Sequence, residues 1–252
     1  MRLLVTRPAE DGAATCAALE ALGHEGMCEP LITIRDVALS ETDGRTLTEA
    51  LKSAQALLVT SANGARALRR QVSLHLPDGA GEISQVRVLA VGAASAEAMG
   101  QAGFADVHQA EGDSAALADL AARVCSPDGG ALVHISGQAV AGDLQGLLAA
   151  RGFEVARFVL YEAEASTRFS AATRGALEAG ALDGVLFFSA RTAKIFCHLC
   201  KEERLEGVLR GLRAFCLSAS VAQVAQTAPF GGVCTAQTPT QAGLLELVGP
   251  PM

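Results

Sequence analysis

The stretch that decides how this chain is interpreted is LLVTRPAEDGAATCAALEALGHE, residues 3–25, because it has a counterpart in LVHISGQAVAGDLQGLLAARGFE, residues 132–154. Each stretch opens with a short apolar run and continues into an Ala/Leu-rich segment of helical period, which predicts a strand followed by a helix. A glycine ends each helical segment, Gly23 in the first and Gly152 in the second, 129 residues apart. A strand–helix element therefore occurs twice.

Three further pairs of segments keep this order at offsets of 126 to 128 residues: ALLVTSANGARAL (56–68) with GVLFFSARTAKIF (184–196), VRVLAVGAASAEAMGQAGF (86–104) with LRAFCLSASVAQVAQTAPF (212–230), and DSAALADLAARV (113–124) with TQAGLLELVGP (240–250). Any two Ala-rich strand–helix segments look alike, but chance does not also preserve their spacing. We therefore predict a duplicated α/β unit.

Strands and helices alternate along both halves, which is typical of parallel sheets covered by helices on both faces. The predicted strands are Leu3–Thr6, Ala56–Thr60, Val86–Val91, Ala131–Ile135, Val185–Phe188 and Ala214–Leu217. In the first helix we expect one apolar face made of Ala14, Ala17, Ala18, Ala21 and Leu22. The predicted fold class is α/β, with two similar domains that are each a doubly wound, flavodoxin-like parallel sheet.

Two β-rich extended segments, residues 27–40 and 153–166, interrupt the alternation. They are placed as if the chain crosses from one domain to the other and returns. We therefore expect a discontinuous domain of residues 1–35 plus 163–252 and a second domain of residues 39–157. Residues 36–38 and 158–162 would form a two-stranded β linker.

The composition excludes several classes of function. Twenty Lys and Arg against 27 Asp and Glu give a net charge of −7, which disfavours binding to nucleic acids and to anionic membranes. Seven cysteines, an odd number scattered through apolar runs, predict reduced thiols in a cytoplasmic protein. We also find neither a signal peptide nor an apolar run of the roughly 20 residues that a membrane span needs.

Small hydroxyl and amide side chains follow the predicted strands in both halves: Ser61, Asn63, Ser95, Ser189, Ser218 and Ser220. Such residues are equally typical of ordinary helix N-caps and of turns whose open backbone amides bind an anion. Because they recur at the carboxyl ends of parallel strands, where α/β sheets bind ligands, the set favours a binding site.

Other motifs carry little chemistry. Cys197 and Cys200 have CxxC spacing but lack a partner motif, and they continue an apolar helical run, so we expect no metal site. His134 lies in a predicted strand without a visible partner. The sequence lacks the GxGxxG, Walker and GxSxG motifs, which argues against nucleotide binding and hydrolase chemistry.

Several segments together resemble the uroporphyrinogen-III synthase family: VTRP (5–8), TSANGARAL (60–68), VLAVGAASAEAM (88–99), and GFEV (152–155) leading to VLYE (159–162). The resemblance covers nearly the whole chain. It implies an enzyme that cyclises and dehydrates hydroxymethylbilane, a linear tetrapyrrole, with inversion of ring D, in a cleft between two domains. It implies a monomer that needs no cofactor or metal. A transient contact with the preceding enzyme of the pathway stays open.

The resemblance also implies roles for individual residues. The hydroxyl and amide residues above, together with Arg7, would bind substrate carboxylates. Tyr161, the only tyrosine, would be the catalytic residue, since a phenol can protonate a departing hydroxyl; the other interpretation is a linker aromatic with a solvated tip. The family often has an arginine near the turn at 135–138 and a threonine where this chain has Val221. An inactive family member and a non-catalytic receptor for a small anion therefore stay as alternatives.

Overall fold

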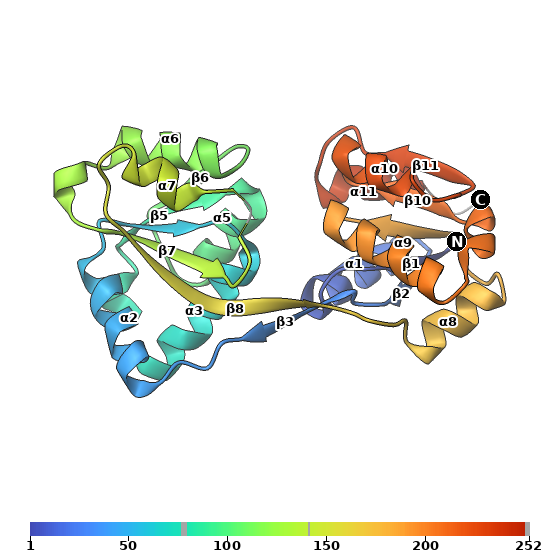
Figure 1. The fold of residues 1–252 in the computed structure, drawn as a ribbon, viewed down its shortest axis with the longest axis horizontal. Coiled ribbons are helices and arrows are strands. Elements are labelled where there is room, and N and C mark those ends of the chain that lie inside the picture. Colours follow the sequence, from blue (N-terminus) through green and yellow to red (C-terminus); the bar gives the residue numbers. More distant parts are fainter. Residues whose placement is uncertain (77–79, 141, 250–252) are drawn as a thin grey trace. The chain divides into compact units, whose positions relative to one another are not determined.

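The computed structural model describes residues 1–76, 80–140 and 142–249, and its contacts divide the chain into two units. Unit 1 comprises residues 1–33 and 164–252, and unit 2 comprises residues 34–163. The chain passes between the units in two neighbouring strands, β3 (Ile32–Asp36) and β8 (Val155–Ala165). Backbone hydrogen bonds from Val37 to Leu160 and from Ser166 to Leu31 show that these two strands run antiparallel (Figure 1).

Unit 1 is built on a five-stranded parallel sheet. Its order is β11-β10-β9-β1-β2, with β1 Arg2–Val5, β2 Glu25–Cys28, β9 Gly184–Phe187, β10 Arg213–Cys216 and β11 Gly232–Thr235. One face packs against α1 (Ala9–Ala21) and α11 (Gln241–Val248). The other packs against α8 (Ala171–Glu178), α9 (Ala190–Glu202), α10 (Ala219–Ala225) and a short 3-10 helix, Glu206–Gly211.

Unit 2 has the same layers around five parallel strands, with β3 added at the edge. The order is β3-β8-β7-β4-β5-β6, with β4 Ala56–Val59, β5 Arg87–Val91, β6 Val107–Ala110 and β7 Leu132–Gly137. One face packs against α2 (Glu41–Ser53), α3 (Ala62–His75), α4 (Ala80–Ile83) and α5 (Gly92–Gln101). The other packs against α6 (Ser114–Val124) and α7 (Leu144–Ala149), with a 3-10 turn at Pro127–Gly129.

The sequence repeat is visible in the strand orders. Strands β2-β1-β9-β10-β11 of unit 1 correspond in space to β8-β7-β4-β5-β6 of unit 2. The pairs matched in sequence, β1 with β7, β9 with β4 and β10 with β5, occupy the same positions in their sheets. The predicted fold class, with two similar parallel sheets flanked by helices, is confirmed.

The six predicted strands are confirmed to within two residues at each end. Strands β2, β6 and β11 were not predicted. All three lie at sheet edges, and most of their side chains are exposed or half-buried. An edge strand does not need the continuous apolar run by which a central strand is found.

The predicted apolar face of α1 is wrong. The helix buries Gly12, Thr15, Cys16 and Leu19, whereas Leu22 is 43% exposed and Ala14, Ala17 and Ala21 are also exposed. The alanines of this helix occur on all of its sides, so the spacing of apolar residues alone does not show which side is buried. The larger side chain of Leu19 contributes more buried area than any alanine and faces the sheet.

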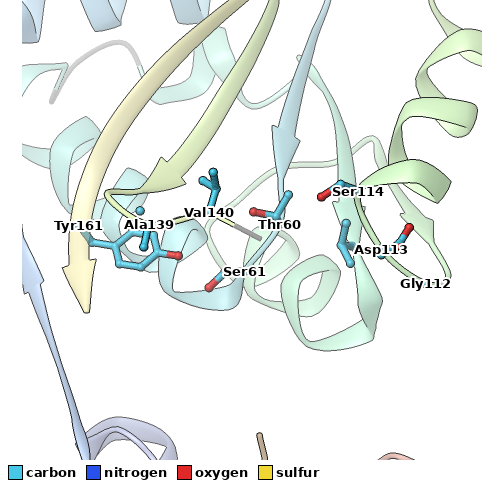
Figure 2. A pocket seen from close by; sticks show the side chains of 10 residues that line it. Thr60, Ser61, Gly112, Asp113, Ser114, Ala139, Val140 and Tyr161 are labelled. Atoms are coloured by element: carbon cyan, nitrogen blue, oxygen red, sulfur yellow. The ribbon is translucent and has the colours of Figure 1, made fainter. Parts of the chain in front are cut away.

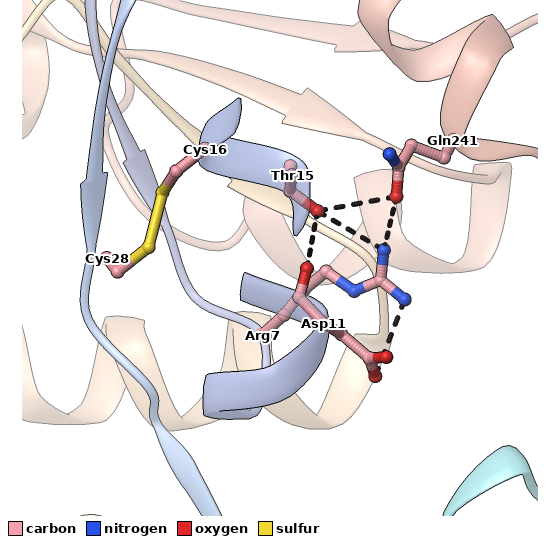
Figure 3. Close-up of a disulfide and its surroundings, with 6 residues drawn as sticks. All are labelled: Arg7, Asp11, Thr15, Cys16, Cys28 and Gln241. Carbon is pink, nitrogen blue, oxygen red and sulfur yellow. Dashed lines mark hydrogen bonds and ion pairs between the residues drawn. A yellow bond between two sulfur atoms is a disulfide. The ribbon is translucent and has the colours of Figure 1, made fainter. Parts of the chain in front are cut away.

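The expectation that the cysteines are reduced thiols is wrong for one pair, because Cys16 and Cys28 form a disulfide (Figure 3). A Cβ atom on Gly26 would lie 2.8 Å from the Cα of Cys16, so the missing side chain lets α1 approach β2 closely. This close approach brings the two sulfurs together across 12 residues of sequence. Cys125, Cys197, Cys200, Cys216 and Cys234 are free. Within the described ranges, no helix has the length and apolarity of a membrane span.

Candidate functional site

A pocket of unit 2, which we call the main pocket to distinguish it from the smaller one described below, opens where the central strands end (Figure 2). It has a volume of about 350 Å³, and its lining includes Thr60, Ser61, Ser114, Gly137, Val140 and Tyr161. These residues come from the carboxyl ends of β4 and β7, from the start of α6 and from β8. Hydroxyl groups therefore gather at the edge of a parallel sheet where ligands are usually bound.

Ser61 belongs both to this pocket and to the start of α3. Its hydroxyl oxygen accepts a hydrogen bond from the backbone N–H of Asn63 at 3.1 Å, which makes Ser61 the N-cap. The hydroxyl hydrogen is left to donate into the pocket. Asn63 lies half-buried in the first turn of α3, and its Oδ1 accepts from Arg66 Nη2 at 2.6 Å. The structure thus brings Ser61 to the pocket and holds Asn63 beside it.

Tyr161 is fixed over the pocket by a local irregularity in the sheet. The β7–β8 register shifts between Ser136 and Gly137, which leaves Gly137 opposite Tyr161. A Cβ on Gly137 would lie 2.8 Å from the tyrosine ring, so only glycine leaves room for it. The residue is 9% exposed and its hydroxyl lies in the same pocket as Ser61 (Figure 2). The ring is therefore buried and its hydroxyl lies in a pocket, an arrangement that both interpretations of Tyr161 allow.

Ser95 is placed differently from the other predicted binding residues. Helix α5 begins at Gly92, whose φ of 73° suits glycine, and Val91 is its N-cap. Ser95 is therefore the fourth residue of the helix and is only 5% exposed. The pocket reaches Val91 at the end of β5, one turn before Ser95.

The predicted binding residues Ser189, Ser218 and Ser220 of unit 1 follow the carboxyl ends of β9 and β10. Ser189 caps α9 by accepting from the backbone N–H of Thr192 at 3.1 Å. Ser218 is the N-cap residue of α10, and its Oγ lies 3.0 Å from the Oγ of Ser220. Val221, the position where family members often have threonine, is 3% exposed and packs in the core.

Arg7 is held by its own surroundings (Figure 3). Its guanidinium donates to Gln241 Oε1 at 2.7 Å and to Thr15 Oγ1 at 3.3 Å. It also lies 3.5 Å from Asp11 Oδ2 and 4.2 Å from the centre of the Phe188 ring. These contacts tie the end of β1 to α1 and α11. The guanidinium faces the carboxylate of Asp11 within unit 1, and its contact with substrate stays a prediction.

A second cavity of about 110 Å³, which we call the His134 pocket, lies beside the main pocket and shares Thr60, Ser114 and Val140 with it. His134 is 3% exposed, and neither of its ring nitrogens has a partner among the described residues. Burial, and secondarily the charge of Arg157, lowers the pKa of His134 to about 4. The only signal of this pocket in the sequence is weak, a histidine between Val133 and Ile135 in a buried strand.

The CxxC segment is part of the α9 core. Burial raises the pKa of Cys197 to about 11 and that of Cys200 still further, so both thiols are protonated and unreactive at neutral pH. Among residues 1–76, 80–140 and 142–249, no group of three or more His, Cys, Asp or Glu side chains is arranged to hold a metal ion.

Comparison with known proteins places this architecture in a family. The family model described as uroporphyrinogen-III synthase HemD matches residues 13–246. The chain belongs to the uroporphyrinogen-III synthase family. A search of curated proteins finds no match.

Two solved structures of uroporphyrinogen-III synthases share the fold. A mutant enzyme from the extremely thermophilic bacterium Thermus thermophilus is 21% identical, with a TM-score of 0.60 over 98% of this chain and 97% of that one. The enzyme from Helicobacter pylori 26695 is 15% identical, with a TM-score of 0.59 over 98% of each chain. At these identities the likeness shows the shared two-sheet fold.

Proposed function

We propose that this protein is an active uroporphyrinogen-III synthase, which cyclises and dehydrates hydroxymethylbilane to uroporphyrinogen III with inversion of ring D. Family membership supports the reaction class. The observation that carries the proposal for this chain is the main pocket of unit 2, where the Tyr161 hydroxyl and the Ser61 hydroxyl share one cavity at the carboxyl ends of parallel strands.

Tyr161 is the proposed general acid. Its phenol donates a proton to the terminal hydroxyl of the substrate, the C–O bond breaks, and the hydroxyl leaves as water. The substituted α-carbon of ring D then attacks the carbon left behind, which gives a spiro intermediate. The bond from that α-carbon to its original bridging carbon breaks, the bridging carbon bonds to the free α-carbon of ring D, and the proton lost there restores the pyrrole and can return to the phenolate of Tyr161. The tight fit of the Tyr161 ring over Gly137 supports this role, because a fixed phenol needs no reorganisation to reach its target.

The other predicted residues bind the substrate in this proposal. A linear tetrapyrrole carries acetate and propionate groups, which hydroxyls and open amides at strand ends can bind without a metal. In unit 2 these donors are Ser61, Asn63 and the first turn around Ser95; in unit 1 they are Ser189, Ser218 and Ser220. For Arg7 we propose a positioning role, since its guanidinium holds the β1 end against α11.

We further propose that the chain works as a cytoplasmic monomer without a cofactor. Size-exclusion chromatography with light scattering tests the oligomeric state directly, and a dimer would contradict it. A passing contact with the enzyme that supplies hydroxymethylbilane is compatible with a monomer.

The decisive experiment supplies the purified protein with freshly generated hydroxymethylbilane and separates the type I and type III products. Formation of the type III isomer is expected, because uncatalysed closure gives type I. In the Tyr161→Phe variant, type III formation should fall by a factor on the order of 100 while the folded structure is kept. Only type I product from the wild-type chain would contradict the proposal, and tight substrate binding without type III product would support the receptor instead.

A further inference from the structure

The His134 pocket contains an arrangement that the reaction as proposed above does not use. His134 sits in the middle of β7 with both ring nitrogens buried and unpartnered among the described residues. A buried polar atom without a partner is costly, and native structures rarely keep one unless a water or ligand satisfies it. The cavity beside the ring is large enough for a few waters or for one small ligand group.

Arg157 brings a positive charge to the same pocket. It lies opposite His134 in the β7–β8 register and lines the cavity. Its Nε donates to Ser136 Oγ at 2.9 Å, and its Nη2 donates to the carbonyl oxygens of Gly137 at 2.9 Å and Gln138 at 3.0 Å. These bonds to neutral oxygens fix the guanidinium at the end of β7, so its charge is oriented but not neutralised by them.

The remaining polar groups around the pocket are mostly neutral, and each of these can both donate and accept a hydrogen bond. Gln145 has an amide, and Thr60 and Ser114 have hydroxyls that face both pockets. The exception is Asp143, whose Oδ1 accepts from the backbone N–H of Gly146 at 2.9 Å and caps α7. Asp143 and Arg157 are both exposed, so solvent screens both charges. Asp143 is already used as the cap of α7, whereas the hydrogen bonds of Arg157 named above go to neutral oxygens.

We propose that the His134 pocket is a carboxylate subsite, in which the Arg157 guanidinium and a ring N–H of His134 hold one acetate or propionate arm of the bound substrate. This inference rests on the proposed function for the identity of the substrate, but the carboxylate chemistry follows from the pocket itself. Its position beside the main pocket lets one molecule occupy both.

The neutral state of the imidazole fits this role. Burial keeps His134 uncharged at neutral pH, so one ring nitrogen carries a hydrogen and donates, while the other accepts from water or from a hydroxyl. The guanidinium of Arg157 pairs with the negative charge of the carboxylate, and the N–H of His134 orients the carboxylate through a directional hydrogen bond. A cationic ligand would have to pair with Asp143, and the fixed guanidinium of Arg157 in the same pocket would repel it.

Binding is tested without turnover by recording the ring nitrogen resonances of His134 in the full-length, ¹⁵N-labelled protein. The probes are propionate, propionamide and propylammonium, which have similar size and differ in charge. Propionate should shift the His134 resonances, and the shift should be lost in Arg157→Gln and kept in Arg157→Lys. A shift by propylammonium that Asp143→Asn abolishes would identify a cation site, and no shift with any probe would remove the subsite; either result overturns the proposal.

Kinetics give the second arm of the test. With hydroxymethylbilane as substrate, His134→Val and Arg157→Gln should each raise KM about tenfold, with a smaller change in kcat, as expected for loss of a charge-assisted or buried hydrogen bond. Arg151→Gln is the matched control, because that arginine is exposed and pairs with Asp119 away from both pockets. An unchanged KM in both variants would contradict the subsite even if type III product is formed.

The proposed enzyme activity and the proposed carboxylate subsite can be refuted independently of each other. If the chain forms no type III product but propionate still shifts His134 in an Arg157-dependent way, the carboxylate subsite stands and the enzyme does not. If His134→Val does not fold, His134→Gln keeps a donor of similar length and is used in its place, with an expected KM closer to that of the wild type.

Discussion

Three corresponding positions in the strand–helix–strand element differ in chemistry between the two units. The 129-residue offset of the repeat and the matching strand registers define them. Unit 1 fills them with an apolar side chain and a disulfide, at Val5, Cys16 and Cys28. Unit 2 fills them with three polar side chains that line a cavity, at His134, Gln145 and Arg157.

The arginine at the strand end shows the same contrast. In unit 1 it comes from the continuation of β1, as Arg7, and its contacts with Asp11 and Gln241 occupy the space (Figure 3). The repeat places Ser136 at the corresponding position of unit 2, and the guanidinium arrives from the neighbouring strand as Arg157. One fold therefore supports cross-linked strands β1 and β2 in one unit and, at the corresponding strands of the other unit, polar side chains that line a cavity.

Val5→His, which puts the histidine of unit 2 at the corresponding position of unit 1, should have the largest effect on stability. Val5→His places an imidazole in a position that is fully buried and flanked by the disulfide. We expect the free energy of unfolding to fall by about 4 kcal/mol, from overpacking plus unsatisfied ring nitrogens. Chemical denaturation measures it.

The reverse exchange, His134→Val, is the control for Val5→His. It should cost less than about 1 kcal/mol, because it removes the unsatisfied atoms along with the ring. Equal losses of stability in Val5→His and His134→Val would contradict the difference described between positions 5 and 134.

Acid should reveal the buried histidine of unit 2. The pKa of His134 is lowered from 6.5 to about 4, so between these pH values the unfolded chain binds a proton that the folded chain does not. Stability should therefore fall by about 3 kcal/mol as the pH drops from 6.5 to 4. Measuring unfolding against pH in wild type and His134→Val isolates this contribution, and parallel curves would refute it.

Removing the disulfide tests the cross-link between α1 and β2 of unit 1. Cys28→Ser should lower the stability of the oxidised protein by roughly 2 to 3 kcal/mol, the effect of cross-linking a short loop. In reductant the variant and the wild type should become nearly equal. Cys125→Ser, at a free and half-buried cysteine of unit 2, should respond to reductant no differently from the wild type.

The smallest effect is expected from filling the space over Gly137. Gly137→Ala places a Cβ against the Tyr161 ring and should reduce turnover about tenfold by displacing the phenol. Gly100→Ala is the matched control, because a Cβ there meets no atom within 4 Å. Normal turnover in Gly137→Ala would mean that the position of the ring does not matter.

The repeat made the fold predictable, because buried central strands such as Ala56–Val59 are continuous apolar runs that stand out from their surroundings. Edge strands such as Val107–Ala110 are half-exposed and carry no such run. The buried face of α1 and the pairing of Cys16 with Cys28 depend on how closely the helix approaches Gly26, which periodicity does not report.

The candidate site was predictable only where a residue follows directly from a strand end. Ser61, Ser189 and Ser218 lie at helix starts, as the pattern indicates. His134 and Arg157 meet because of the β7–β8 register, and Gly137 meets Tyr161 because of the register shift. These pairings join residues that are far apart along the chain, and a single sequence holds no local signal for them.

The central claim is that the polar ends of β7 and β8 in unit 2 hold carboxylates of the tetrapyrrole, whereas the corresponding ends of β1 and β2 in unit 1 are taken up by the disulfide and by the contacts of Arg7. Backbone hydrogen exchange with and without uroporphyrinogen III, kept anaerobic, tests it most directly. Binding should slow exchange at residues 134–140 and 157–161 more than at residues 5–8 and 25–28. Protection confined to the unit 1 segments would contradict the account.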